Sequence, residues 1–494
     1  MSKKKPQPRP AAATLAPAAT DVDHFAVSQG VFVAIGAALV LAGATLRVLA
    51  AQGELWLDEL WSFRLVHTLT EPAGIFTRLH HDNNHHLNSL YLWFVAESPV
   101  WIRYRLHVVV AGIATLVLAA VLARREGGRA PAIGVTLLLS GSFLMVLYAS
   151  EARGYALAVC FAFSAVLLAA RFLENGRYVW AASYNIVVVL GILSHLTFLH
   201  ALMGLMVWTA WRAVRQDGRV NAWRAVATLH LVPLTALAVL YWLDLRHTIV
   251  GGGPVFGTWT VMARALSLCV GGPDGGPWLV PAASIAAIAG VLSIGLVRRS
   301  GSDLWVLIAV TAVVAPALTL LTVDTTLLFE RYFLVAAAFL TFSFAWLLAA
   351  AVRRSYLLGA ALALAFLVPN ATRIARLIDL GRGAYLPAVQ HMIAGATQHP
   401  VTVGSDHDFR NGRLVEFYRQ FVPGGAGLEY HSSIEWAPAG PEWMLVHSQD
   451  HAFAPRTDLA LTGGRRYRLA AFYPTAGVSG WHLAVYHNVL AVPR

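Results

Sequence analysis

Eleven apolar segments constrain the fold of this chain more than any other feature of its sequence. Each is close to the ~20 residues that an α-helix needs to cross the hydrocarbon core of a bilayer. Only 13% of the 494 residues are charged and 57% are hydrophobic, with a mean hydropathy of +0.59, whereas soluble domains carry about 25% charged residues. We therefore predict a mainly α-helical polytopic membrane protein. The predicted spans are residues 31–51, 104–123, 131–149, 152–172, 178–194, 197–214, 225–243, 278–297, 303–322, 332–351 and 356–372.

The basic residues indicate how these spans are oriented. Lysine and arginine in the short loops gather on one side of the predicted membrane, which is expected to be the cytoplasmic side. These residues are Lys3, Lys4, Lys5, Arg124, Arg125, Arg129, Arg171, Arg177, Arg212, Arg215, Arg219, Arg224, Arg298, Arg299, Arg353 and Arg354. The net charge of +11 is thus largely explained by basic residues in the cytoplasmic loops of a membrane protein. No nucleic-acid partner is expected.

This orientation divides the chain into three predicted parts. Residues 1–29 are rich in Pro and Ala, and we expect a disordered cytoplasmic tail. Residues 30–372 form the transmembrane domain, in which residues 58–79 of the outer loop 52–103 suit amphipathic helices on the membrane surface. Residues 373–494 have a soluble composition and are predicted to form a small extracytoplasmic α/β domain. Its expected elements are a helix at 384–398 and strands at 443–447, 465–472 and 481–487.

An acidic pair, Asp58-Glu59, follows the first span and lies between Trp56 and Trp61. Two adjacent carboxylates among tryptophans and leucines are costly to desolvate unless a site uses them. A surface loop with an aromatic belt explains the same residues about as well. The pair alone therefore leaves a functional site and a headgroup-level loop equally open.

Three further polar clusters fall on the same outer side. The first, residues 80–88, holds four histidines, three asparagines and an aspartate, and includes Asn84, His85, His86 and Asn88. Such imidazoles and amides can bind hydroxyls, phosphate or, with aspartate, a divalent metal, although a polar loop cap is the simpler interpretation. The others are Ser150–Tyr155, with Arg153 and Tyr155, and Phe329–Tyr332, with Glu330, Arg331 and Tyr332. Arginine at this depth can hold a phosphate through two hydrogen bonds.

Together these motifs resemble the membrane-embedded GT-C glycosyltransferases. The similar branch holds protein O-mannosyltransferases, lipid A aminoarabinose transferases and related enzymes that use polyprenyl-phosphate sugars. A first helix ending in Arg47 is followed by Leu55-Trp56-Leu57-Asp58-Glu59-Leu60-Trp61-Ser62, then by Asn83-Asn84-His85-His86-Leu87-Asn88. Ser98 to Arg105, Ser150–Tyr155, Ser194-His195 and Glu330-Arg331-Tyr332 match further family segments in order. The resemblance covers residues 47–332, and its motifs are specific in combination rather than singly.

The resemblance implies an inverting glycosyltransferase, in which a polyprenyl-phosphate-linked sugar meets an acceptor hydroxyl on the extracytoplasmic side. Asp58 would act as general base or orient the acceptor, and Glu59 would hydrogen-bond acceptor or sugar. Arg153 and Arg331 would hold the departing phosphate. A divalent metal held by His86 and His195 is the one cofactor that the resemblance leaves open.

Two other classes fit the same composition. The first is a transporter or flippase for a lipid-linked sugar, which would favour polar residues inside the spans and internal repeats; neither is evident. The second is a sugar-lipid-binding protein without activity. The glycosyltransferase interpretation places the chain in a bacterial inner membrane, with the C-terminal domain in the periplasm. It names neither the sugar nor the acceptor, which can be a glycan, a lipid or a protein.

Overall fold

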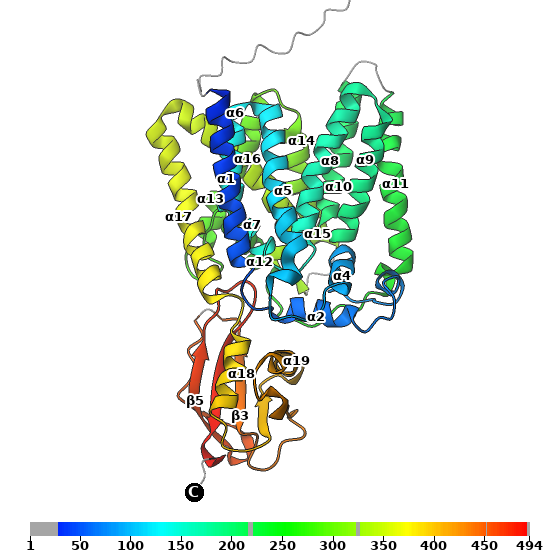
Figure 1. Ribbon diagram of the computed structural model, residues 1–494. Coiled ribbons are helices and arrows are strands. Elements are labelled where there is room, and N and C mark those ends of the chain that lie inside the picture. The colour runs from blue at the N-terminus through cyan, green and yellow to red at the C-terminus, as the bar shows by residue number, and fades with distance from the viewer. Residues whose placement is uncertain (1–27, 216–220, 323–326, 451, 492–494) are drawn as a thin grey trace, which may run out of the picture.

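The computed structural model describes residues 28–215, 221–322, 327–450 and 452–491. Residues 1–27 of the predicted tail 1–29 therefore lie outside the described residues. The chain forms a bundle of long helices with a sheet-containing domain at one end (Figure 1). The bundle helices are α1 (Gln29–Ala50), α5 (Ile102–Gly127), α6 (Arg129–Gly141), α7 (Phe143–Tyr148), α8 (Tyr155–Asn175), α9 (Tyr178–Ser194), α10 (Phe198–Arg215), α11 (Ala222–Leu243), α13 (Leu279–Arg299), α14 (Leu304–Ala309), α15 (Ala315–Thr322), α16 (Leu334–Arg354) and α17 (Tyr356–Leu380).

Every predicted span coincides with helix, and the fold class is confirmed as that of a multi-pass membrane protein. Within the described ranges, eight helices are long and apolar enough to cross a membrane, so the count of eleven spans stays a prediction. The span predicted at 131–149 is interrupted at Ser142, between α6 and α7. The span at 303–322 contains a π-helical stretch, Val310–Val314. The last span is longer than predicted, since α17 continues past Pro369 to Leu380.

Helix α16 is the most enclosed part of the bundle and contacts α6, α8, α10, α13 and α17. Small residues make this packing possible: a Cβ added at Gly134 of α6 would lie 3.2 Å from Ala345 of α16. Close helix approach at small residues is the usual packing of membrane helices. The outward faces of α13 and α17 carry large exposed apolar side chains, including Val280, Val291 and Leu357, as lipid contact requires.

Short helices lie across one end of the bundle, called the site end from here on. They are α2 (Leu57–Val66), α3 (Gly74–Thr77), α4 (His86–Trp93) and α12 (Thr258–Cys269). α3 falls within the stretch 58–79 that was expected to form surface helices, and α2 begins one residue before it. The arginine-rich loops lie at the opposite end, where Arg124 and Arg129 reach Gln29 at the start of α1.

The C-terminal domain is a six-stranded mixed sheet in the order β2-β1-β3-β6-β5-β4. β1 pairs in parallel with β2 and β3, and the remaining pairs are antiparallel. Helices α18 and α19 pack together against one face. The predicted helix at 384–398 and the three predicted strands are confirmed as α18, β3, β5 and β6. The elements are α18 (Tyr385–Ala394), β1 (Val401–Ser405), α19 (Asp408–Tyr418), β2 (Leu428–Tyr430), β3 (Trp443–Ser448), β4 (Asp458–Ala460), β5 (Arg466–Tyr473) and β6 (His482–Asn488).

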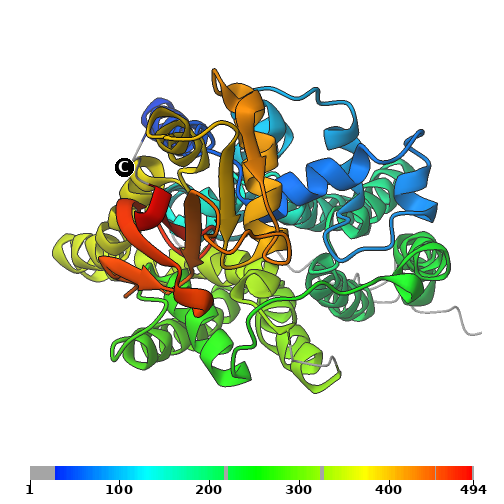
Figure 2. The ribbon, with the colours of Figure 1, turned by 90° about the horizontal axis from the view of Figure 1, so that it is seen from below.

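The domain is attached to the segment that joins α1 to α2. Glu54 accepts hydrogen bonds from the backbone N–H groups of Tyr385 (2.6 Å) and Leu386 (2.9 Å), the first two residues of α18. The Tyr418 hydroxyl of α19 donates to the carbonyl of Leu55 at 2.7 Å. Seen from the site end, the domain lies over part of the bundle with the segment 52–103 beside it (Figure 2). The C-terminal domain is therefore attached within a few residues of the acidic pair.

Candidate active site

Asp58 lies at the centre of the site as the second residue of α2, with its side chain 21% exposed. Arg153, from the turn before α8, forms an ion pair with its Oδ2 atom. Arg331, from the 3-10 turn Glu330–Phe333 that leads into α16, brings Nη2 to 3.7 Å of the same oxygen. The other oxygen, Oδ1, has no hydrogen-bond partner in the described part of the chain. Residues almost 300 positions apart thus converge on one carboxylate with one free acceptor atom.

An imidazole and aromatic wall continues from Arg153. The ring of His85 lies 4.4 Å from that of His195 and 5.5 Å from that of Tyr155, measured between centroids. Tyr332 lies 6.4 Å from His195. Burial lowers the pKa of His85 well below its usual value, and the neighbouring charges of His195, Arg153 and Arg331 lower it further. His85 is therefore a neutral hydrogen-bonding group at neutral pH.

Gly154 allows this wall to form. A Cβ at this position would lie 1.7 Å from the carbonyl oxygen of Ser194 and 3.1 Å from the His85 side chain. The Gly154 backbone N–H donates to His85 Nδ1 at 3.0 Å. Only a glycine lets the start of α8, the His85 loop and the α9–α10 junction approach so closely.

Glu59, the neighbour of Asp58, has different surroundings. Its side chain is fully buried and accepts two hydrogen bonds of 2.6 Å from Arg105, one to each carboxylate oxygen. It also accepts the backbone N–H of Ala152 at 2.7 Å. Burial alone would raise the pKa of Glu59, but the Arg105 guanidinium outweighs burial and lowers it. Glu59 is thus a saturated, enclosed carboxylate that touches no open space.

A second buried pair lies behind the Arg153 turn. Glu151 and Arg382 both have fully buried side chains, and Arg382 Nε lies 3.6 Å from Glu151 Oε2. Arg382 also donates to the carbonyl of Leu147 (2.8 Å) and to Ser150 Oγ (3.0 Å). Burial raises the pKa of Glu151. Arg105 was expected only as the end of the matched segment Ser98 to Arg105, and Arg382 was not expected at this site, although an arginine within an apolar span, such as Arg105, was a usable signal.

Two asparagines of the histidine-rich cluster, Asn84 and Asn88, bond to residues other than Asp58, whereas Asn83 donates to the Asp58 carbonyl at 3.3 Å. Asn84 donates to the carbonyls of Ile75 and Leu79, each at 2.8 Å, and Asn88 accepts from His107 at 2.9 Å. Both side chains are buried. These two predicted ligand-binding residues therefore hold the shape of the outer segment.

The predicted metal pair of His86 and His195 does not come together. His86 Nε2 pairs with Asp244 Oδ2 at 2.7 Å, and His195 Nδ1 accepts the backbone N–H of Thr197 at 3.0 Å. It is His85, the residue before His86, that packs on His195. Within the described residues no group of three or more His, Cys, Asp or Glu is arranged to hold a metal. One ring nitrogen of each histidine is therefore engaged by a different residue, Nε2 of His86 by Asp244 and Nδ1 of His195 by Thr197.

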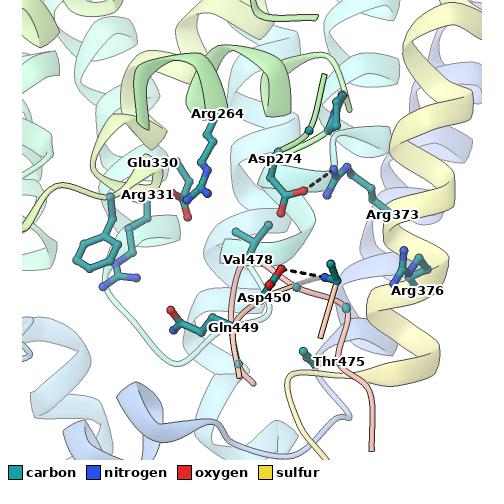
Figure 3. Close-up of a pocket in the computed structure, with 18 of the residues that line it drawn as sticks. Arg264, Asp274, Glu330, Arg331, Arg373, Arg376, Gln449, Asp450, Thr475 and Val478 are labelled. Atoms are coloured by element: carbon teal, nitrogen blue, oxygen red, sulfur yellow. Dashed lines mark hydrogen bonds and ion pairs between the residues drawn. The ribbon is translucent and has the colours of Figure 1, made fainter. Parts of the chain in front are cut away.

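A cavity of about 980 Å³ lies between the site end and the C-terminal domain. Trp56, Glu330 and Arg331 line it on the side of Asp58, and Arg264 approaches from α12 (Figure 3). Arg373 and Arg376 of α17 line the far side, where Arg373 pairs with Asp274 at 3.1 Å. The loops after β3 and β5 close the cavity from the C-terminal domain. The three further arginines were not anticipated, because they lie beyond the matched motifs or in segments with no distinctive pattern.

The arrangement combines an acceptor oxygen, two guanidinium groups and a large cavity that three further arginines line. Guanidinium pairs suit phosphate oxygens, and the cavity is at the upper end of the ~300–1,000 Å³ range of ligand sites. Of the predicted site residues, Asp58, His85, Arg153, Tyr155, Arg331 and Tyr332 form one cluster. Glu330 lines the adjacent cavity, whereas Glu59, Asn84, His86 and Asn88 lie in supporting positions.

Comparison with known proteins supports the fold. No family model and no curated protein matches the sequence. ArnT from Cupriavidus metallidurans bound to undecaprenyl phosphate is similar in structure, with a TM-score of 0.52 and 12% identity over 95% of this chain and 100% of that one. ArnT in the apo state gives 0.53 and 12% over 94% and 99%. The Archaeoglobus fulgidus oligosaccharyltransferase with Zn and sulfate gives 0.46 and 10% over 83% and 67%. The GT-C fold expected from the motifs is confirmed by the similarity to ArnT.

Proposed function

We propose that this protein is a membrane glycosyltransferase that moves a sugar from a polyprenyl-phosphate-linked donor to an acceptor hydroxyl. The observation that carries the proposal is Asp58, held between Arg153 and Arg331 beside a cavity that Arg331 also lines. Undecaprenyl phosphate is bound by a protein of the same fold. The described polar residues of the site gather at one end of the bundle, which favours an enzyme over a transporter.

The arginines and Asp58 have linked roles in this proposal. Both guanidinium groups are directed at Asp58 Oδ2. A donor phosphate attracts the two guanidinium groups and leaves the carboxylate available to the acceptor. The acceptor oxygen attacks the anomeric carbon, its proton moves to Asp58, and the bond from carbon to phosphate oxygen breaks with inversion. The two arginines then stabilise the charge on the departing lipid phosphate.

Glu59 has a positioning role in the same proposal. Its carboxylate binds the Ala152 N–H, one residue before Arg153, and lies next to Asp58 on α2. Glu59 therefore fixes the distance between the proposed base and the proposed phosphate ligand.

The chain is proposed to be oriented with its arginine-rich loops in the cytoplasm and the site end in the periplasm of a bacterial inner membrane. The donor then reaches the cavity from the outer leaflet, and the acceptor is a cell-envelope glycan, lipid or protein. Alkaline phosphatase joined after residue 494 is expected to be active in cells, and joined before residue 1 to be inactive. The reverse pattern would contradict the orientation.

Donor consumption by purified protein in nanodiscs tests the activity. A panel of polyprenyl-phosphate sugars is supplied with an envelope extract as acceptor, and release of polyprenyl phosphate is measured. Asp58→Asn is expected to lower the rate by about 10²–10⁴-fold, which is the usual contribution of a general base. The matched control is Glu71→Gln, since Glu71 is an exposed acid of the same outer segment that pairs with the exposed Arg78. Equal rates for wild type and Asp58→Asn would refute the proposal.

A further inference from the structure

The loop between β5 and β6, residues Thr475–Gly480, inserts from the C-terminal domain into the bundle. Ala476 and Val478 pack with the core of the helical bundle rather than with the sheet. Thr475 donates its hydroxyl to the carbonyl of Gly381 at 3.1 Å, and the Ala476 N–H donates to the same oxygen at 3.2 Å. We call residues 475–480 the finger. These two hydrogen bonds attach the finger to Gly381, the residue that follows α17.

The finger ends on the turn that carries Arg153. Ser479 Oγ donates to Glu151 Oε2 at 2.9 Å, and both side chains are buried. Glu151 is two residues before Arg153, and Ala152 between them is held by Glu59. The Arg153 turn is therefore fixed from two directions: by α2 through Glu59, and by the finger through Ser479.

The backbone of the finger is strained. Val478 has φ +67°, and among the described residues it is the one non-glycine with positive φ. A β-branched residue in this conformation costs free energy and persists only where the surroundings impose it, which is frequent at functional sites. Gly480 has φ +93°, and a Cβ there would lie 1.7 Å from the carbonyl oxygen of Arg382. The surrounding residues thus constrain the backbone conformation of the finger at Val478 and Gly480.

We infer that the finger is a positioning element for the active site, and that Ser479 sets the placement of Arg153 through Glu151. The C-terminal domain is then a working part of the transferase and not only a cover for the cavity. Val478 also lines the cavity (Figure 3), so the same loop contacts the space in which the donor is proposed to bind. This inference rests on the proposed function, in which Arg153 holds the donor phosphate.

The test compares Ser479→Ala with Ser405→Ala in the full-length protein in nanodiscs. Ser405 is an equally buried serine of the C-terminal domain whose hydroxyl contacts Tyr430 at 2.6 Å, within that domain. For Ser479→Ala we expect about a tenfold rise in donor KM or fall in kcat, as expected for one lost buried hydrogen bond. The acceptor KM should not change, and Ser479→Thr should restore the donor KM. Ser405→Ala should alter stability only.

Val478→Gly separates positioning from stability. Glycine adopts φ +67° without strain, which offsets part of the packing on the bundle that the Val478 side chain loses, so the melting temperature should change little while kcat falls. A purely structural finger would make stability and activity change in the same direction. The inference is overturned if Ser479→Ala and Val478→Gly keep the wild-type donor KM and kcat per folded molecule. Asp58→Asn in the same assay distinguishes failure of this inference from failure of the proposed function. An active Asp58→Asn variant would refute the proposed function, whatever the finger variants do.

Discussion

Two neighbouring charge clusters at the site end differ in how completely they are closed. Glu59 and Arg105 form a cluster with no exposed side-chain surface, in which both carboxylate oxygens accept bonds from the guanidinium. Asp58, Arg153 and Arg331 form an open cluster with a 21% exposed carboxylate and one long contact of 3.7 Å. Adjacent acids in one sequence motif can therefore have different structural roles. The carboxylate of the closed cluster fixes the position of neighbouring residues, whereas the carboxylate of the open cluster still has an oxygen that can accept a hydrogen bond from a ligand.

The largest expected effect comes from opening the closed cluster. Glu59→Leu leaves the Arg105 charge buried without its carboxylate, and removing one partner of a buried pair typically costs about 3–5 kcal/mol. A large fall in thermal midpoint in detergent, with loss of activity, is expected. Asp58→Asn keeps a side-chain oxygen that can accept from Arg153, and it should lower the midpoint by much less. Equal destabilisation by the two variants would show that the clusters do not differ as described.

The next effect is a pH dependence of stability at the attachment of the C-terminal domain. Burial raises the pKa of Glu54 to about 7, against the opposing bonds from Leu386 and Tyr385 and the charge of Arg105. Because the folded protein holds this proton more tightly than the unfolded chain, stability should decrease as pH rises from about 4.5 to about 7, and level off above. Thermal midpoints measured across that window should show the slope in the wild type and a smaller slope in Glu54→Gln. Identical slopes would contradict the assignment to Glu54.

A smaller effect is expected within the open cluster. Arg331→Lys keeps the charge but loses the planar pair of donors that matches phosphate oxygens. Donor KM should rise about tenfold, as expected for the loss of one charge-assisted hydrogen bond, with the thermal midpoint unchanged. Arg78→Lys, in an exposed pair of the same segment, serves as the control. An unchanged donor KM would place the phosphate elsewhere in the cavity.

The smallest effect concerns the surface pair between α2 and α19. Arg64 Nη1 lies 3.3 Å from Glu416 Oε2, with side chains 26% and 42% exposed. Exposed pairs contribute about 0–1 kcal/mol and are screened by salt. Glu416→Gln should therefore change the midpoint slightly at low salt and not at high salt. A change as large as that of Glu59→Leu would show that charge alone, and not closure, decides the energetics.

The sequence predicted what depends on composition and local pattern. Apolar runs near 20 residues located the bundle helices, and alternation in Trp443–Ser448 located a central strand whose Trp443 and Leu445 face one core while Met444 faces the other. The strand Val401–Ser405 was missed because it is short and contains Gly404, and α19 because Asp408–Tyr418 is largely polar. The motif order also placed Asp58, Arg153 and Arg331 in one site.

Partners from distant elements could not be predicted in the same way. Glu59 and Asp58 are both acids beside tryptophans, and only the three-dimensional contacts show that Arg105 closes one and leaves the other open. The resemblance left open a metal held by His86 and His195, whereas in the structure His86 pairs with Asp244 and His85 packs on His195. Arg382 and Ser479 reach Glu151 over more than 200 residues. Spacing carries no information about such contacts.

The hydrogen bonds between Glu54 and the first residues of α18 have a practical consequence for expression of the C-terminal domain by itself. Expression of residues 382–494 alone would remove the carboxylate that accepts the N–H groups of Tyr385 and Leu386, and would leave the first turn of α18 without its cap. It would also leave the Tyr418 hydroxyl without the Leu55 carbonyl. A fragment intended for crystallisation or antibody selection should therefore carry residues 53–57 grafted before α18, or an acidic capping residue at position 384.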